Sequence, residues 1–135
     1  MKKAARSLPD TNIIVRYLVA DELALHAKAA EFFDKVMNGG VRAIILESVI
    51  AECIYVLTKI YKVPRDRAAG SLIDILHYKG IANADQQELL LALSLFSEQN
   101  LDIVDCILCA KAVAAGDNLF SFDADLNKLA KRINP

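Results

Sequence analysis

Short apolar runs alternate along this chain with longer segments that have the periodicity of a helix. Residues 41–46 (VRAIIL) and 119–122 (LFSF) are short runs dominated by apolar residues, and residues 8–18 hold a third, rich in β-branched side chains. Residues 21–37 instead place apolar side chains three and four positions apart, which is typical of an amphipathic helix. Such alternation predicts an α/β fold with a mainly parallel sheet covered by helices.

The boundaries of the other elements follow from capping and breaking residues. Asn38 and the two glycines after it end the first helix, Pro64 opens a later one and Gly116 closes another. Residues 81–84 form a weak strand candidate, and Asp85 with Glu88 resembles a capping box. The remaining helices are expected at residues 48 to about 61, 64–79, 85–98, 101–115 and 125–132.

The chain has 135 residues, of which 55% are hydrophobic, and this is enough for one buried core. We therefore expect a single domain over residues 1–135. The net charge of -1 argues against a protein that coats nucleic acid by bulk charge. No stretch resembles a membrane span or a signal peptide, and an odd count of three cysteines suits reduced thiols. A cytoplasmic location is expected.

Acidic residues follow the apolar runs at several places. Asp10 lies within the first run, and Asp123 directly follows residues 119–122. Glu52 and Asp105 lie on predicted helices whose neighbouring positions on the same face are mostly apolar. Because ligands gather beyond the carboxyl ends of parallel strands, these acids are expected to converge on one acidic site.

Converging carboxylates repel one another unless something neutralises them. Two of them about 4 Å apart cost roughly 4 kcal/mol at an effective dielectric constant near 20. No lysine or arginine adjoins Asp10, Glu52, Asp105 or Asp123 in the sequence. A set of oxygen ligands favours Mg²⁺ or Mn²⁺ over zinc, so the pattern predicts a divalent-cation site.

These acids and their surroundings resemble the motifs of the PIN domain, and most closely those of VapC-type toxins of bacterial toxin–antitoxin pairs. The motifs are Asp10-Thr11-Asn12, AECIYVL around Glu52, DIVDCIL around Asp105 and SFDADL around Asp123. Their order and spacing cover nearly the whole chain. Pro9, directly before Asp10, is a departure from the family pattern, since it removes one donor from the strand ladder.

The resemblance implies a three-layer α/β/α sandwich with a short, mainly parallel central sheet. It also implies a metal-dependent ribonuclease, using Mg²⁺ or Mn²⁺, that hydrolyses phosphodiester bonds in structured RNA such as tRNA or rRNA. A cognate antitoxin protein would hold this enzyme inactive, and the enzyme would be a homodimer.

Carried over residue by residue, the resemblance gives Asp10, Glu52, Asp105 and Asp123 the catalytic and metal-binding roles. Asp125 could share or replace the role of Asp123. Asn12 and Ser121 match polar positions that steady the acids. A basic rim for RNA could draw on Arg16, Lys111, Lys128, Lys131 and Arg132, with Arg16 and Lys128 as the leading candidates.

Other functions stay open beside this one. The first alternative is a non-catalytic PIN-fold protein that acts by binding a partner. A receiver-type signalling domain would need a lysine after the last strand, and none follows residues 119–122 directly. Cys106-x-x-Cys109 could suggest zinc or redox chemistry, but it lies in an apolar helix without a second pair, which favours buried core thiols.

Overall fold

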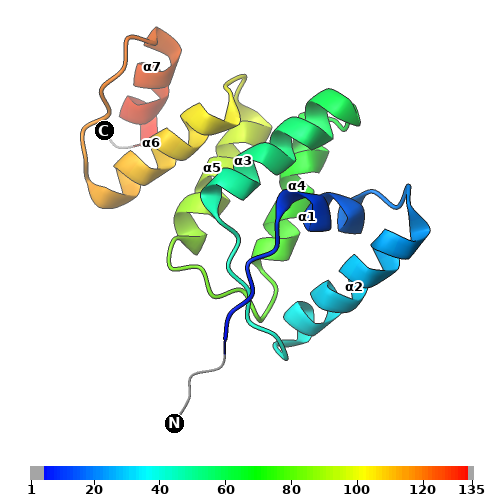
Figure 1. Ribbon diagram of the computed structural model, residues 1–135. Coiled ribbons are helices and arrows are strands. Elements are labelled where there is room, and N and C mark those ends of the chain that lie inside the picture. The colour runs from blue at the N-terminus through cyan, green and yellow to red at the C-terminus, as the bar shows by residue number, and fades with distance from the viewer. Residues whose placement is uncertain (1–4, 134–135) are drawn as a thin grey trace.

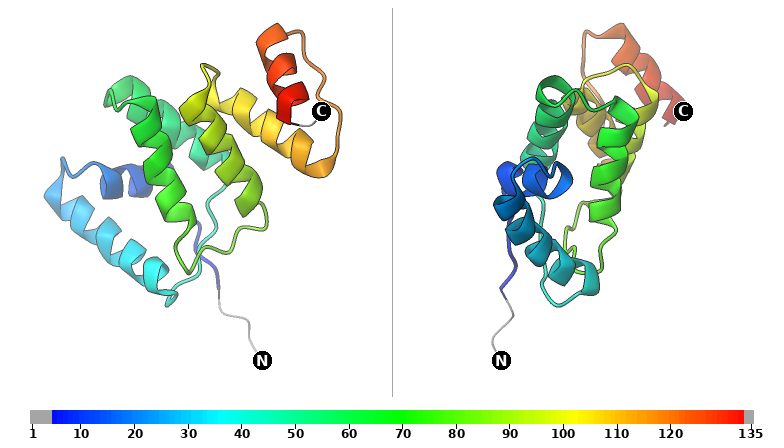
Figure 2. Two further views of the ribbon diagram at one scale, coloured as in Figure 1. Left: turned by 180° about the vertical axis from the view of Figure 1, so that it is seen from behind. Right: turned by 90° about the vertical axis from the view of Figure 1, so that its right-hand side faces the viewer.

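A computed structural model describes residues 5–133 of the chain and shows a mainly helical molecule (Figure 1). The helices α1 and α2 lie at one end, α3, α4 and α5 form the middle, and α6 with α7 form the other end (Figures 1 and 2). The helices are α1 Thr11–Leu18, α2 Leu23–Asn38, α3 Glu47–Tyr55, the π-helix η1 Val56–Ile60, α4 Arg65–Leu76, α5 Gln86–Glu98, α6 Ile103–Ala115 and α7 Ala124–Ile133.

Three extended segments run in parallel through the middle of the molecule. Ser7 and Ala43 form one parallel bridge, and Ala43 and Ile81 form the other. The Ser7 N–H donates to the Arg42 carbonyl and the Ala43 N–H to the Gly80 carbonyl, each at 2.9 Å. The parallel direction agrees with the sequence prediction. A continuous sheet, and hence the expected three-layer sandwich, is not formed within the described residues.

The side chain of Asn83 explains in part why this pairing is so short. Its Oδ1 accepts from the Ile45 N–H at 2.9 Å, and its Nδ2 donates to the Ile45 carbonyl at 2.7 Å. In a parallel ladder those two backbone groups would pair with the next strand. The amide of Asn83 therefore takes the place of a peptide group and ends the ladder after Ala43.

The prediction of a strand continuing through residues 8–18 is wrong. Asp10 has extended backbone angles, and its Oδ1 accepts a hydrogen bond from the Ile13 N–H at 3.0 Å, which starts α1. Aspartate at this position satisfies an N–H group that has no partner inside the helix. Ile14 and Val15 are buried on the inner face of α1, so core packing overrides their β-branched preference.

The strand expected at residues 119–122 is also absent, because no backbone pairing involves this segment within residues 5–133. The Phe120 and Phe122 side chains are 87% and 97% exposed. The chain continues directly into α7, whose Leu126 and Leu129 are buried. Packing of α7 on α6 therefore holds the segment away from the three extended segments (Figure 1).

The predicted helices are confirmed with small shifts of their ends. Gly39 and Gly116 end α2 and α6 with φ values of 85° and 68°, a left-handed conformation that glycine adopts without strain. Pro64 precedes the first residue of α4. The helix expected at residues 48–61 changes into the π-helix η1 at Val56.

The core lies between the helices and encloses all three thiols. Phe33, Ile50 and Leu72 are fully buried members of this core. Cys106 and Cys109 are buried as well, so the interpretation of this pair as core thiols is confirmed. No described helix is long and apolar enough to cross a membrane.

Candidate active site

Asp10 and Glu52 both act electrostatically on the buried thiol of Cys53. Asp10 caps α1, Glu52 lies on α3, and these two helices pack against each other. Burial raises the pKa of Cys53 to about 12, the negative charges of Glu52 and Asp10 raise it as well, and a hydrogen bond with Thr11 opposes them. Both carboxylates are exposed, yet both act on one sulfur atom, so they share one region of the surface.

Asp105 and Asp123 form a second group of acids. Burial raises the pKa of Asp105 above the usual range of an aspartate, and the charges of Asp102 and Asp123 raise it further. The N–H of Asp123 donates to Ser121 Oγ at 2.9 Å, and its Oδ1 accepts from the Leu126 N–H at 3.0 Å. Asp123 thus caps α7, and its negative charge raises the pKa of Asp105.

A groove of about 820 Å³ lies beside Asp105. Its walls come from α3 and η1 on one side and from the start of α6 on the other. Tyr55 and Val104 line it and are 61% and 62% exposed, and Lys59 adds a positive charge. The groove can therefore hold an extended ligand next to an acidic residue whose pKa is shifted.

The two acidic groups do not form one metal site in this structure. Among residues 5–133, no three His, Cys, Asp or Glu side chains lie close enough together to hold an ion. The donor set of Asp10, Glu52, Asp105 and Asp123 has the chemistry for a hard cation, but its arrangement does not fit one. Asp10 and Glu52 both act on Cys53, whereas Asp123 acts on Asp105.

Comparison with known families assigns the chain to a family. The family model described as the PIN domain matches residues 7–132. The chain belongs to the PIN domain family. No curated protein and no solved structure is significantly similar to it. PIN domains are typically metal-dependent nucleases, so the match over residues 7–132 suggests nuclease activity in general.

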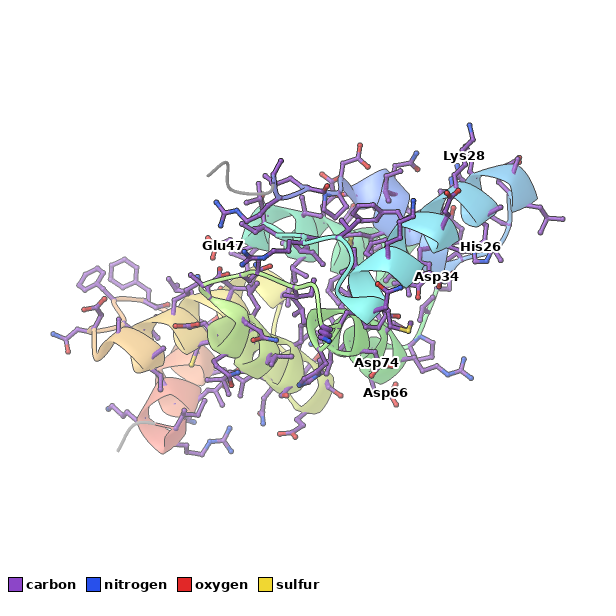
Figure 3. All side chains as sticks on the ribbon, turned by 90° about the horizontal axis from the view of Figure 1, so that it is seen from below. His26, Lys28, Asp34, Glu47, Asp66 and Asp74 are labelled. Carbon is purple, nitrogen blue, oxygen red and sulfur yellow. The ribbon has the colours of Figure 1, made fainter. Side chains whose placement is uncertain are left out.

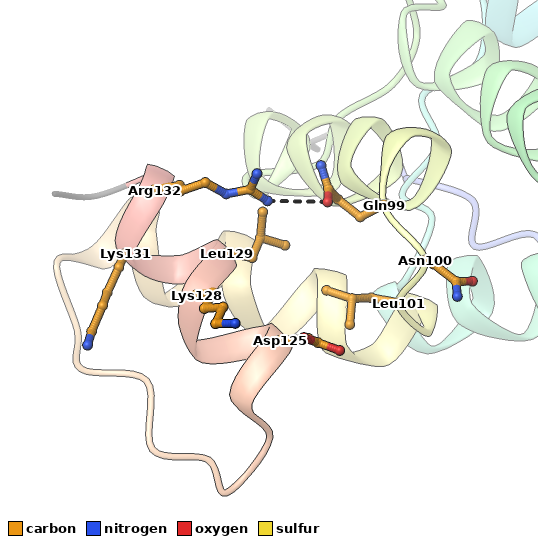
Figure 4. A pocket seen from close by; sticks show the side chains of 8 residues that line it. All are labelled: Gln99, Asn100, Leu101, Asp125, Lys128, Leu129, Lys131 and Arg132. Carbon is orange, nitrogen blue, oxygen red and sulfur yellow. Dashed lines mark hydrogen bonds between the residues drawn. The ribbon is translucent and has the colours of Figure 1, made fainter.

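Asp125 of this PIN domain was expected to share or replace the role of Asp123. It lines a different pocket of about 590 Å³, formed by α7 and the turn between α5 and α6. Lys128 and Lys131 line the same pocket, and Arg132 Nη2 donates to Gln99 Oε1 at 3.3 Å (Figure 4). Lys128 therefore lies in a pocket together with two other cationic side chains, Lys131 and Arg132.

Two other basic residues proposed for the RNA-binding rim form ion pairs with carboxylates. Arg16 forms a 2.9 Å ion pair with Asp21. Lys111 pairs with Asp85 at 2.8 Å and with Glu47 at 3.4 Å. Lys111 thus joins the start of α3 to the start of α5.

Asp85 does not close the capping box that the sequence suggested. It precedes α5, but its side chain makes no hydrogen bond to that helix. Asp85 Oδ1 accepts from Asn83 Nδ2 at 3.0 Å, and Oδ2 accepts from Lys111. Asp85 does not cap α5 because Asn83 and Lys111 bind its carboxylate instead.

Sequence reasoning missed Arg65, which supports the groove. Its Nη2 donates to the carbonyl oxygens of Phe96, Gln99 and Leu101 at 3.0, 2.8 and 2.6 Å. These carbonyls belong to the end of α5 and the turn that leads to α6 and Asp105. The only local signal was an arginine beside Pro64 at a helix start, which does not reveal a distant partner.

Three aspartates outside the candidate site lie on the exposed surface. Asp34, Asp66 and Asp74 are exposed, and Figure 3 shows Asp34 on α2 and Asp66 and Asp74 on α4. Asn12 is exposed on α1 next to Asp10. It therefore stays a candidate supporting residue.

Proposed function

We propose that this PIN domain is a ribonuclease that depends on Mg²⁺ or Mn²⁺ and acts as a VapC-type toxin of a toxin–antitoxin pair. Its substrate would be structured RNA such as tRNA or rRNA, cut by hydrolysis of a phosphodiester bond. The catalytic acids are Asp10, Glu52, Asp105 and Asp123. The family match and the order of these acids in the chain support the proposal.

The environment of Asp105 is the observation that carries this proposal. Its carboxyl group lines the groove, and both burial and the like charges of Asp102 and Asp123 raise its pKa. An acid in a groove whose pKa is raised by burial and by neighbouring charges is a candidate for a catalytic or cation-binding role. A site of this kind gains stability when a cation offsets the repulsion between its carboxylates.

The groove also supports the partners proposed for this enzyme. Exposed Tyr55 could stack on an RNA base, and Lys59 could contact the RNA backbone. Tyr55 and Val104 together also leave apolar surface open on the same groove, and such surface marks sites of protein binding. A cognate antitoxin that covers this groove would block access to Asp105.

An RNA cleavage assay tests the proposal. Wild-type protein, Asp105→Asn and Glu98→Gln are incubated with total tRNA and rRNA in Mn²⁺, in Mg²⁺ and in EDTA. We expect discrete cleavage products that disappear in EDTA and a fall in rate on the order of 100-fold or more in Asp105→Asn. Glu98 is exposed at the end of α5, so Glu98→Gln should cleave at the wild-type rate.

The assay also separates the second candidate function, a PIN-fold protein that acts only by binding a partner. The open apolar mouth of the groove at Tyr55 and Val104 favours this alternative. Cleavage that survives Asp105→Asn would show that another enzyme or another site is responsible. Absence of cleavage by folded wild-type protein with either metal ion would favour the binding protein.

A further inference from the structure

The pocket beside α7 collects an excess of positive charge. Lys128, Lys131 and Arg132 line it, and the one acidic side chain among the lining residues that the structure describes is Asp125. Three positive charges against one negative charge leave a formal charge of +2 there, on a chain whose net charge is -1. None of the three cations forms an ion pair with a residue in the range 5–133. Their charge is therefore available to an anionic ligand.

The size and lining of this pocket suit one nucleotide unit. Its volume of about 590 Å³ lies within the range of roughly 300–1,000 Å³ that holds small organic ligands. Leu101 and Leu129 also line it and supply apolar surface against which a sugar or a base can pack. Cationic and apolar lining residues together match a nucleotide, which joins an anionic phosphate to the flat face of a base.

Cationic side chains form one wall of the pocket and amide side chains form the other. Lys128 and Arg132 extend from α7, and Gln99 and Asn100 belong to the turn between α5 and α6 (Figure 4). Arg132 Nη2 donates to Gln99 Oε1 at 3.3 Å, a long and exposed hydrogen bond that a phosphate oxygen can replace. Lys131 extends away from Gln99 in Figure 4, so Lys128 and Arg132 are the main candidates for contact with a phosphate.

The pocket adjoins the groove that holds Asp105. Asn100 lines both of them, and while Leu101 lines the pocket, the next residue, Asp102, lines the groove. A strand of RNA that leaves the groove past Asn100 therefore enters the pocket. Asn100 is exposed at this junction, and its side-chain amide can donate a hydrogen bond to the backbone of that strand.

We propose that this pocket binds a phosphodiester of the RNA backbone close to the one that is cut beside Asp105. This deepens the proposed function and rests on it. Lys128 and Arg132 hold the phosphate by charge-assisted hydrogen bonds, and the planar guanidinium of Arg132 can contact two of its oxygens. Phosphate contacts fix the position of a strand without reading its sequence. The pocket thus anchors the RNA and places the scissile bond beside the acids.

The adjoining groove favours RNA over an acidic protein segment as the occupant. Tyr55 and Lys59 line the groove, and Tyr55 is 61% exposed. Stacking of bases on aromatic side chains and contact of phosphates with basic ones recur together in sites for single-stranded nucleic acid. An acidic peptide would place carboxylates beside Asp102 and Asp105 and would offer no base to Tyr55. The pocket and the groove together therefore suit a nucleic-acid strand.

RNA binding measured in EDTA tests the pocket without any need for cleavage. A fluorescein-labelled single-stranded RNA is titrated with wild type, with Lys128→Gln/Arg132→Gln, here the pocket variant, and with the control Lys35→Gln/Arg67→Gln, at several KCl concentrations. The control removes the same two charges from exposed positions outside the pocket and the groove. We expect the pocket variant to bind about tenfold more weakly and its slope of log K against log [KCl] to be shallower by about 0.7, since one phosphate contact is lost. The control should match wild type.

Two results of this titration overturn the proposal. Equal weakening in the pocket variant and the control would show that bulk charge, and not the pocket, attracts RNA. Wild-type affinity and salt slope in a pocket variant that is folded by circular dichroism would show that RNA does not use the pocket. Asn100→Asp gives an independent check, because it adds a negative charge at the exposed junction and should weaken binding as well.

NMR titrations identify the class of ligand. Inorganic phosphate and cytidine 5′-monophosphate should shift the backbone amide signals of Gln99, Asn100 and Lys128 saturably and leave that of Lys35 unchanged. Hexaglutamate serves as the probe for an acidic protein segment. Shifts of the pocket signals by hexaglutamate but by neither phosphate compound would assign the pocket to a protein partner and overturn the proposal.

Cleavage kinetics distinguish the pocket from the catalytic acids. An anchoring contact is made equally in the bound and the reacting RNA, so the pocket variant should raise KM about tenfold and keep kcat within about threefold of wild type. Asp105→Asn should instead lower kcat. Pocket-dependent RNA binding without any cleavage by wild type would refute the proposed function and leave the phosphate pocket standing. Cleavage that depends on Asp105, with an unchanged KM in the pocket variant, would overturn the pocket and leave the proposed function standing.

Discussion

Arg65 holds the aromatic ring and the carbonyl oxygen of Phe96 at once. Its guanidinium carbon lies 3.6 Å from the centre of the Phe96 ring, and its Nη2 donates to the Phe96 carbonyl at 3.0 Å. The same nitrogen reaches the carbonyls of Gln99 and Leu101. One side chain from the start of α4 therefore fixes the turn that leads into α6.

Replacement of Arg65 by lysine should loosen this turn. A lysine ammonium cannot reproduce the planar contact with Phe96. Carbonyl groups left without a hydrogen-bond donor lower the stability of the fold. We expect Arg65→Lys to lower the free energy of unfolding by about 2 kcal/mol in urea titrations. Arg67 is exposed on the same helix, so Arg67→Lys is the matched control. Equal stability of Arg65→Lys and Arg67→Lys would contradict this role.

Gly80 and Gly70 should respond to alanine in opposite directions. A Cβ atom at Gly80 would meet the Val41 carbonyl and would lie 2.7 Å from the Val36 carbonyl, whereas at Gly70 nothing lies within 4 Å. Gly80→Ala should therefore lower the free energy of unfolding by about 3 kcal/mol or more. Gly70 lies inside α4, where Gly70→Ala should raise it by about 0.5–1 kcal/mol. Thermal unfolding of both variants measures the contrast, and a tolerated Gly80→Ala would refute the close approach.

The bridge from Lys111 to Asp85 and Glu47 should contribute to stability over a limited pH range. Burial raises the pKa of Asp85, but hydrogen bonds from Lys111 and Asn83 bring it below the usual range. A carboxylate with a lowered pKa stabilises the fold above its unfolded pKa, and this contribution is lost as pH falls through the folded pKa. Lys111→Met should cost about 1 kcal/mol at pH 7 and low salt. The difference from wild type should shrink in acid and in 1 M NaCl, and a difference independent of salt would argue against the ion pairs.

Asp105 should oppose folding at neutral pH. Its raised pKa means that the protonated form is favoured in the folded chain, so its stabilising effect is present below the unfolded pKa and is lost as pH rises through the folded pKa. Asp105→Asn should therefore raise the Tm at pH 7 by about 1–3 °C and leave it unchanged below about pH 4. Calorimetry at both pH values without metal ions checks this. A lower Tm at pH 7 would show that the carboxylate is needed for packing.

The helices could be predicted from the sequence because their signals are local. The apolar spacing of α2 and the glycines Gly39 and Gly116 identify a helix and its end within a few residues. The strand expected at residues 8–18 is wrong because short β-branched runs suit both strands and buried helices, and distant packing decides between them. The strand expected at residues 119–122 is wrong because a strand needs a distant partner segment, and no described segment pairs with these residues.

The candidate site likewise combines features with a local sequence signal and features that depend on distant residues. The positions of Glu52 and Asp105 on helices followed from their apolar neighbours. The side-chain amide of Asn83, which replaces a peptide group at Ile45, depends on residues 38 positions apart and has no local signal. The role of Lys111 as a bridge rather than an RNA contact likewise depends on Asp85 and Glu47.

The amide of Asn83 at the end of the short ladder also has a consequence for association between chains. Unpaired N–H and C=O groups at the end of a strand are a template for pairing with a further strand. Because Asn83 satisfies both backbone groups of Ile45, this end of the ladder offers no such template at Ile45.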